Sequence, residues 1–244
     1  MNAVEITDLR KEYRDTVAVK ELTLTVRKGE LFGLLGVNGA GKTTTVKMLS
    51  GLTPKTSGDA KLMGYSIGNA ADREKIKRIT NTSPQETAVA PNLTVRENLE
   101  FMAGMYGLSG NELREKCDGI MKELRLDTVS GKKAKTLSGG WQRRLSIGMA
   151  LVSGPEILFL DEATLGLDVI ARRELWEIIS ALRGKVTAII TTHYLEEAEH
   201  LCDRVAIMAG GELRAVGTVQ ELLALSGCDK FEDAFIKLAS EGKI

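Results

Sequence analysis

Several kinds of residue are scarce in this sequence, and each scarcity argues against a class of protein. Only three cysteines, Cys117, Cys202 and Cys228, occur among 244 residues; they form no CxxC pair and have no histidine at ligand spacing. This pattern disfavours a disulfide scaffold or a zinc module, so we expect three small buried or half-buried thiols. Four prolines and no low-complexity segment leave no recognisable linker.

Long apolar runs and an excess of charge are missing as well. The longest uninterrupted apolar runs, such as 157–160 and 205–209, are far shorter than the roughly 20 residues of a membrane-spanning helix. The first twelve residues mix acids and bases where a signal peptide would carry an apolar stretch. Since 33 basic residues balance 33 acidic ones, the net charge does not attract nucleic acid. We therefore predict a cytoplasmic protein without a nucleic-acid partner.

What is present is the composition of a globular domain, with 43% hydrophobic and 27% charged residues. Strand-like and helix-like segments alternate, which predicts an α/β fold with a parallel-strand core and right-handed crossovers. Strands are expected at 4–9, 21–26, 31–36, within 59–67, and at 78–82, 157–161, 186–191 and 204–208. Helices are expected at 43–52, 70–77, within 93–125, at 138–152, 169–183 and 194–201, and within 218–242.

The most informative glycine loop follows the predicted strand 31–36. Residues 36–43 read GVNGAGKT and match GxxxxGK[ST], directly after a strand and at the start of a helix. Backbone amides at such a helix start bind phosphate, Lys42 would reach the β and γ phosphates, and the Thr43 hydroxyl would bind Mg²⁺. The sequence therefore predicts a nucleoside triphosphate site. Its expected contact residues are Gly36, Asn38, Gly39, Ala40, Gly41, Lys42, Thr43 and Thr44.

A second part of this site is predicted where the apolar strand 157–161 ends in two adjacent carboxylates. Because side chains alternate along a strand, Asp161 can hold the Mg²⁺ shell while Glu162 points elsewhere and can polarise a water. A carboxylate at position 162 indicates hydrolysis of the nucleotide rather than binding alone.

A third segment is more specific, since small kinases and GTPases share the first two. Residues 137–144 read LSGGWQRR and stand about twenty residues before the strand that ends at Asp161. Ser138 is a favourable N-cap, and Gly139 and Gly140 expose amides at a helix start, which makes a second anion site. Two phosphate-binding helix ends in one chain indicate a nucleotide held at an interface.

This segment resembles the LSGGQ signature of ATP-binding cassette (ABC) proteins, and the resemblance extends over about 4–217. It implies the P-loop NTPase fold of ABC ATPases, with a parallel-strand core, an antiparallel β subdomain and a helical subdomain. A single domain is expected over 1–244, with the core and β subdomain in 1–85 and 154–217, the helical subdomain in about 86–153, and C-terminal helices in 218–244.

The resemblance also implies roles for single residues. Tyr13 matches the aromatic residue that stacks on adenine, and Gln85 matches the Q-loop glutamine, which contacts the metal and links the site to a membrane partner. Asp168 matches the D-loop aspartate at a dimer interface, and His193 matches the switch histidine that touches the γ-phosphate. The other histidine, His200, is expected to be solvated or capping. The implied catalytic residues are Glu162, His193 and Gln85, and the implied metal ligands are Thr43, Gln85 and Asp161.

A head-to-tail dimer, of two copies or of this chain with a paralogous ATPase, follows from the same resemblance. Each of two ATP–Mg²⁺ would lie between Lys42 of one subunit and Ser138, Gly139 and Gly140 of the other. The electrostatic reason is independent of the family, because one phosphate loop leaves the outer face of the γ-phosphate exposed and a second helix end can cover it.

Three positions depart from the family's pattern. Trp141 stands where glutamine is usual, which puts a polar contact to the partner's nucleotide in question, and Ala163 and Val169 occupy positions that are often proline. None of these removes a charge or ligand needed for hydrolysis, so an active ATPase is expected.

The segments 91–108 and 191–213 look like those of bacterial exporter ATPases for drugs, antibiotics or polysaccharides. With no span of its own, such a subunit would recruit integral membrane permease subunits near Gln85 and 91–125, and would lie on the inner face of the cell membrane. An importer ATPase and a soluble ABC ATPase acting on DNA, ribosomes or iron–sulfur assembly stay open as alternatives. One cassette, no heptad insert and no basic surplus disfavour the soluble alternative.

Overall fold

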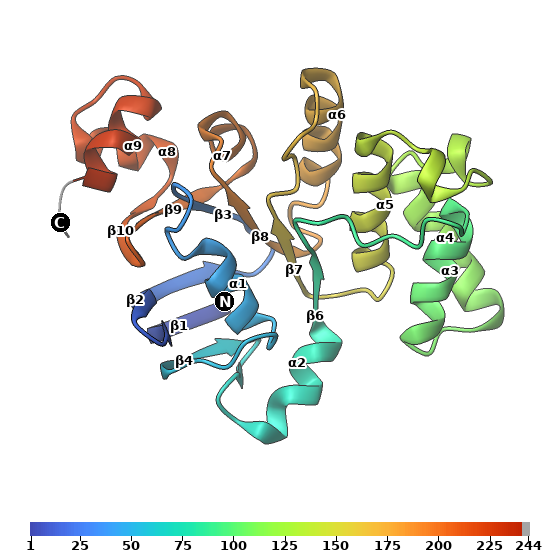
Figure 1. Cartoon of the computed structure of the whole chain (residues 1–244), viewed down its shortest axis with the longest axis horizontal. Helices are drawn as coiled ribbons and strands as arrows, with labels where there is room; N and C mark the ends of the chain where they lie inside the picture. The colour runs from blue at the N-terminus through green and yellow to red at the C-terminus, as the bar shows by residue number, and fades with distance from the viewer. Residues whose placement is uncertain (241–244) are drawn as a thin grey trace.

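The structure, a computed structural model, describes residues 1–240, which form two β-sheets and the helices packed around them (Figure 1). The larger sheet has the order β10-β9-β3-β8-β7-β6. Strands β9, β3, β8, β7 and β6 run parallel and β10 runs antiparallel to β9, so the predicted parallel core is confirmed. Its strands are β3 (Leu31–Leu35), β6 (Thr80–Ser83), β7 (Ile157–Asp161), β8 (Thr187–Thr192), β9 (Arg204–Ala209) and β10 (Glu212–Gly217).

The central strands are buried on both faces. Every residue of β3, β7 and β8 is buried, which explains why they read as continuous apolar runs rather than as alternating ones. Along β7, Leu158 and Leu160 enter one apolar cluster while Ile157 and Phe159 enter a second. The sheet therefore separates two apolar cores. Because both of its faces are covered, solvent and ligands can approach these strands at their ends.

The smaller sheet covers one face of the larger one together with α1 (Lys42–Leu49). Its order is β2-β1-β4-β5, and all its pairings are antiparallel, as expected for the β subdomain. The strands are β1 (Asn2–Tyr13), β2 (Thr16–Arg27), β4 (Ser57–Leu62) and β5 (Tyr65–Ser66). Both long strands extend well beyond the predicted 4–9 and 21–26.

Three helices, α3 (Val95–Met105), α4 (Gly110–Glu123) and α5 (Gly139–Leu151), gather at the end of the molecule away from the C-terminus (Figure 1). They pack closely at Gly148, where an added Cβ would lie 2.8 Å from Leu124 Cδ1 and 3.2 Å from Leu99 Cδ2. Their apolar side chains join the cluster beneath the large sheet, so the helical group and the sheet share one core.

The remaining helices are α2 (Arg73–Ile79), α6 (Val169–Ser180), α7 (Leu195–Leu201), α8 (Val219–Ser226) and α9 (Phe231–Ser240). Helix α2 continues through residues 78–79, which were predicted as the start of a strand, so β6 begins only at Thr80. Segment 218–242 holds two helices, and its last two residues lie outside the described part. Cys117 and Cys202 are buried and Cys228 is half-buried, as expected. None of the helices within 1–240 combines the length and hydropathy that crossing a bilayer requires.

Candidate active site

The carboxyl-terminal ends of β3, β7 and β8 meet at one edge of the large sheet, and the motif residues gather there. They surround a cleft of about 640 Å³ between the phosphate loop and the ends of β1 and β2. The lining includes Tyr13, Asn38, Gly39, Ala40, Gly41, Lys42, Thr43, Thr44, Gln85, Glu162 and His193. Residues 16–18 at the start of β2 and Leu165 also line this cleft, although no sequence pattern singled them out.

The phosphate loop curls tightly because glycine occupies its critical positions. Gly39 and Gly41 have φ of +81° and +99°, in the left-handed region that favours glycine. At Gly36 a Cβ would lie 2.4 Å from the carbonyl oxygen of Met208, so only glycine fits without movement of the backbone. Helix α1 begins at Lys42 without a side-chain cap, which leaves its first amides available to an anion.

Lys42 is nearly fully buried inside this loop. Its Nζ donates hydrogen bonds to the carbonyl oxygens of Gly36 (2.7 Å) and Val37 (3.2 Å). Burial lowers the pKa of Lys42, and the negative charges of Glu162 and Asp161 oppose that effect. A desolvated ammonium group beside the amides of this loop is suited to bind a phosphate. The negative charge of the phosphate would compensate for the water that the ammonium group loses on burial.

Thr43, which lines the cleft, contacts the buried Asp161. The Thr43 hydroxyl donates to Asp161 Oδ1 at 3.1 Å, and the hydroxyl of Thr191, a residue that sequence reasoning missed, donates to the same oxygen. No group of three or more His, Cys, Asp or Glu side chains within 1–240 could hold a metal by itself. One hydroxyl and one carboxylate nevertheless fit Mg²⁺, which commonly takes its other ligands from substrate phosphates and water.

Glu162, the residue after Asp161, forms a pair with His193. Glu162 Oε1 lies 3.1 Å from His193 Nδ1. The Glu162 backbone has φ of +47°, an uncommon conformation for a residue with a side chain, and its amide donates to the Thr191 carbonyl (3.1 Å) and hydroxyl (3.0 Å). This sharp turn directs Asp161 to Thr43 and Glu162 to His193, so the two adjacent carboxylates have different partners.

Tyr13 and Gln85 also line the cleft. Tyr13 ends β1 and is 44% exposed, with Lys11 Nζ lying 4.7 Å from the centre of its ring. An exposed aromatic ring beside a phosphate loop offers a stacking surface for a base. Gln85 follows β6 and reaches the lining from the side of the helical group.

The predicted second anion site lies elsewhere on the surface. Ser138 and Gly139 are exposed at the start of α5, and neither they nor Gly140 line the cleft. Ser138 occupies the N-cap position, but its hydroxyl makes no capping hydrogen bond, so the first amides of α5 have no side-chain acceptor. Within one chain, the two helix starts that were predicted to bind phosphate therefore do not line one cleft.

Asp168 caps its own helix. Its Oδ1 accepts hydrogen bonds from the amides of Ile170 and Ala171, each at 2.9 Å, at the start of α6. The same helix start packs against the signature segment, because an added Cβ at Gly140 would lie 3.1 Å from Ala171 Cβ. Trp141, the departure from the signature pattern, packs its ring under the Arg144 guanidinium at 4.6 Å.

Helix α7, which follows His193 in the chain, carries the second histidine and a buried carboxyl group. His200 is exposed and stacks on Trp176 with ring centroids 5.1 Å apart, so it is solvated as expected. Glu197 is fully buried and accepts a hydrogen bond from Trp176 Nε1 (3.3 Å). Burial raises the pKa of the Glu197 carboxyl.

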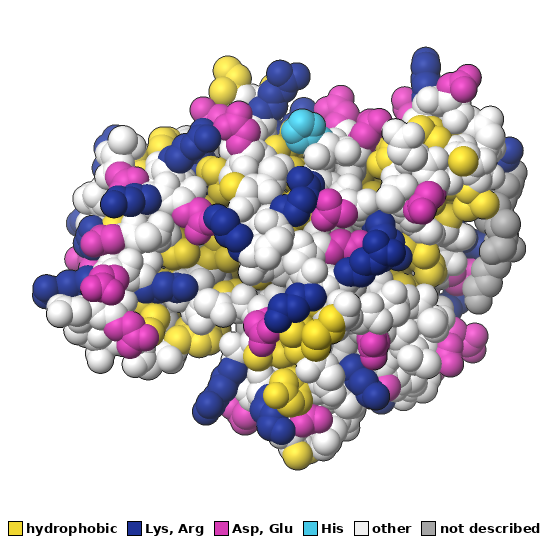
Figure 2. All heavy atoms as spheres, turned by 180° about the vertical axis from the view of Figure 1, so that it is seen from behind, with side chains coloured by type: hydrophobic (Ala, Val, Ile, Leu, Met, Phe, Trp, Pro, Cys, Tyr) yellow, Lys and Arg dark blue, Asp and Glu magenta, His cyan; other side chains and the backbone are white. Residues whose placement is uncertain are grey.

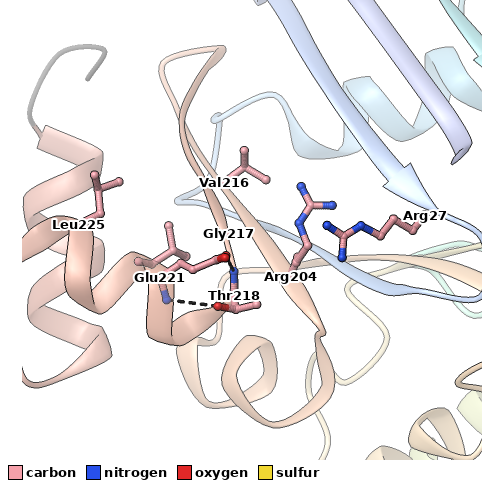
Figure 3. A pocket seen from close by; sticks show the side chains of 8 residues that line it. Arg27, Arg204, Val216, Gly217, Thr218, Glu221 and Leu225 are labelled. Carbon is pink, nitrogen blue, oxygen red and sulfur yellow. Dashed lines mark hydrogen bonds between the residues drawn. The ribbon is translucent and has the colours of Figure 1, made fainter. Parts of the chain in front are cut away.

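A separate cavity of about 440 Å³ lies between the end of β2, β10 and α8 (Figure 3). Arg27 and Arg204 project into it side by side, next to the capping box formed by Thr218 and Glu221. None of the motif residues lines this cavity. On the face shown in Figure 2, basic and acidic side chains are interspersed rather than gathered into one basic surface.

Comparisons with known proteins agree with this geometry. A protein-family model described as "ABC transporter" matches residues 19–165. The chain is 41% identical to the linearmycin resistance ATP-binding protein LnrL of Bacillus subtilis (strain 168), over 91% of this chain and 71% of that protein. It is 38% identical to the Nod factor export ATP-binding protein I of Ralstonia nicotianae, over 94% of this chain and 71% of that protein. Other relatives at 41% identity are much longer, and the chain spans only 12–13% of their length.

Among solved structures, the fold is similar to a dimeric post-hydrolysis state of an ATP-binding cassette bound to ADP and Pi. The TM-score is 0.78 at 26% identity, and the match covers 88% of this chain and 98% of that one.

Proposed function

The chain belongs to the ABC transporter family, as an ABC ATPase domain, and from this premise we propose that it hydrolyses ATP to drive the permease subunits of an exporter. The observation that carries the proposal is that Lys42, Thr43 with its partner Asp161, and the Glu162–His193 pair converge at one cleft. Exporter-type relatives, named for antibiotic resistance and Nod factor export, support the direction of transport.

Each group has a defined task in this proposal. The loop amides and Lys42 bind the β and γ phosphates and neutralise their charge. Thr43 and Asp161, with Gln85, hold Mg²⁺, which when bound stabilises the charge that develops on the phosphate oxygens. Glu162 accepts a proton from the attacking water. With its Nδ1 protonated, His193 donates to the Glu162 carboxylate and fixes its direction. Tyr13 stacks on the base.

A second ATPase subunit completes the site. The exposed start of α5, with amides that no side chain caps, supports a role for Ser138, Gly139 and Gly140 in covering the γ-phosphate bound by another copy or a paralogue. The dimeric arrangement of the solved relative bound to ADP and Pi supports the same geometry. Asp168, next to the signature glycines, would then lie at this interface.

The permease is proposed to dock beside the helical group, on the inner face of the membrane. Exposed apolar side chains gather there, with Leu52 70%, Phe101 57% and Met105 71% exposed. A shallow groove lined by Leu52, Tyr106 and residues 80–82 runs between the end of α1, β6 and α3. These side chains offer an apolar contact close to Gln85, which follows β6 in the chain.

Two measurements test this function. The purified chain should release phosphate from ATP in the presence of Mg²⁺, and Lys42→Ala should abolish nucleotide binding; unchanged ATP affinity would contradict the phosphate-loop assignment. From a detergent extract of the source cells, the tagged chain should capture a polytopic membrane protein. Phe101→Glu should lose this protein, whereas Ile236→Glu, at 58% exposure on α9, should retain it. Recovery of ribosomes or DNA alone would favour the soluble alternative.

A further inference from the structure

Arg143, on the second turn of α5, binds the backbone of two functional loops at once. Its Nη1 donates to the carbonyl oxygen of Pro84 (2.5 Å), and its Nη2 donates to the carbonyl oxygens of Gln85 (2.9 Å) and Glu162 (3.0 Å). The residue is only 3% exposed. One side chain therefore connects three parts of the site: the Q-loop, the backbone of Glu162, and helix α5, which begins with the signature glycines.

A buried arginine with these partners is unusual. Buried cations normally pair with a carboxylate, because an unpaired buried charge is costly. Among the described residues Arg143 makes no ion pair within 4.0 Å, and the partners of its three hydrogen bonds are all backbone carbonyl oxygens. Burial lowers the pKa of Arg143, while Asp161, Glu197 and Glu162 oppose this from a greater distance. Since arginine stays protonated in proteins, the charge strengthens all three hydrogen bonds to the loops.

The bond to Glu162 acts on a strained position. Glu162 has φ of +47°, and its amide is already held by Thr191 on β8. Arg143 holds the carbonyl on the other side of the same residue, so the direction of the carboxylate depends on both attachments. The same nitrogen, Arg143 Nη2, donates to the carbonyl oxygens of Glu162 and Gln85. A shift of the Q-loop or of α5 must therefore alter the hydrogen bond that holds Glu162.

We propose that Arg143 is a positioning residue that aligns Glu162 for hydrolysis only when the Q-loop and α5 are in the arrangement seen here. This inference rests on the proposed function of Glu162. Arg143 itself does not line the cleft. It gives the site a mechanical link by which a partner bound near Gln85, or a nucleotide covered by the start of α5, controls catalysis in the same chain.

The test separates positioning from packing by steady-state kinetics of Arg143→Gln and Arg143→Lys. A displacement of about 1 Å in a catalytic group costs on the order of 100-fold in rate, so Arg143→Gln should lower kcat by about 100-fold. Its KM for ATP should stay within about threefold, since the phosphate-binding groups are untouched. Arg143→Lys keeps the charge but cannot span three carbonyl oxygens, and should restore only part of the rate.

Arg204→Gln is the matched control. Arg204 is another largely buried arginine that donates to a backbone carbonyl, that of Thr25 (3.3 Å), and it pairs with Glu30 (3.3 Å). It lines the second cavity (Figure 3), at the amino end of β9, and it does not line the cleft. Its kcat should equal that of the unaltered chain. The double variant Arg143→Gln/Glu162→Gln should still form an ATP-dependent dimer, because Arg143 acts on catalysis and not on binding.

Three outcomes would overturn the inference: unchanged kcat in Arg143→Gln, a rise in KM that accounts for the whole loss, or unfolding of both Arg143 variants in thermal melts. The last would give the residue a purely structural role. If the unaltered chain itself hydrolyses no ATP, the proposed function fails instead, so the two failures are distinguishable.

Discussion

Replacing Glu162 with glutamine removes the proposed base and little else. The side chain is nearly buried, and its carboxylate lies 3.1 Å from His193 Nδ1. Glutamine has the same shape and retains an oxygen that can accept that hydrogen bond. The phosphate-binding Lys42 and the Thr43–Asp161 pair are unchanged, so the substitution separates binding from hydrolysis.

The expected size of the effect follows from the role assigned. Loss of a positioned general base costs about 10²–10⁴ in rate, which corresponds to about 3–5 kcal/mol of transition-state stabilisation. ATP affinity should be equal or higher, because one negative charge beside the γ-phosphate disappears. Hydrolysis would then no longer separate the subunits, and the ATP-bound dimer should accumulate.

The assay combines phosphate release, equilibrium nucleotide binding and sizing chromatography with ATP and Mg²⁺. Asp161→Asn is the contrasting variant, since it alters a proposed metal ligand and should weaken Mg²⁺-dependent binding as well as the rate. If Glu162→Gln turns over ATP at a rate close to that of the unaltered chain, Glu162 is not the base. If it loses activity without forming a dimer, the shared nucleotide site is wrong.

Three other substitutions test separate parts of the structure. Ser138→Glu places a negative charge where the partner's γ-phosphate is expected, although the charge interacts favourably with the dipole of α5. The substitution should abolish the ATP-dependent dimer of the Glu162→Gln variant and leave ATP binding by one chain intact. Gly148→Ala puts a Cβ 2.8 Å from Leu124 Cδ1 and should lower the free energy of unfolding in urea by about 1–2 kcal/mol, after the gain in helix propensity. Because burial raises the pKa of Glu197 above its ordinary 4.5, the folded chain holds this proton to higher pH than the unfolded chain, and the stability it contributes falls as pH rises from about 4.5. Glu197→Gln should therefore raise the melting temperature at pH 8 more than at pH 5; an equal shift at both pH values would contradict a raised pKa.

Much of the cleft was predictable because its signals are local. The glycine spacing of the phosphate loop, the apolar strand that ends at Asp161 and the strand that ends at His193 each depend on neighbours in sequence. Their convergence follows from the parallel sheet, which brings successive carboxyl ends to one edge.

Other features depend on contacts that no local pattern reveals. Strand β10 was missed because it includes Glu212 and Arg214 and has few buried residues, so its sequence lacks an apolar pattern. It is defined by its pairing with β9. Arg143 was missed because its partners Pro84 and Gln85 lie 59 and 58 residues away along the chain. The free hydroxyl of Ser138 could not be foreseen either, since a good capping residue need not make the capping bond.

The shared core beneath the large sheet bears on how the molecule can move. One continuous apolar cluster runs from Leu99 on α3, through Leu158 on β7, to Phe231 and Leu238 on α9. Its distant segments should lose their structure together on heating, as one calorimetric peak rather than as two. The end that carries α3 and α4 is then not an independently folded module. A force applied there by a membrane partner would rotate it together with the sheet as a rigid body, rather than unfold it locally.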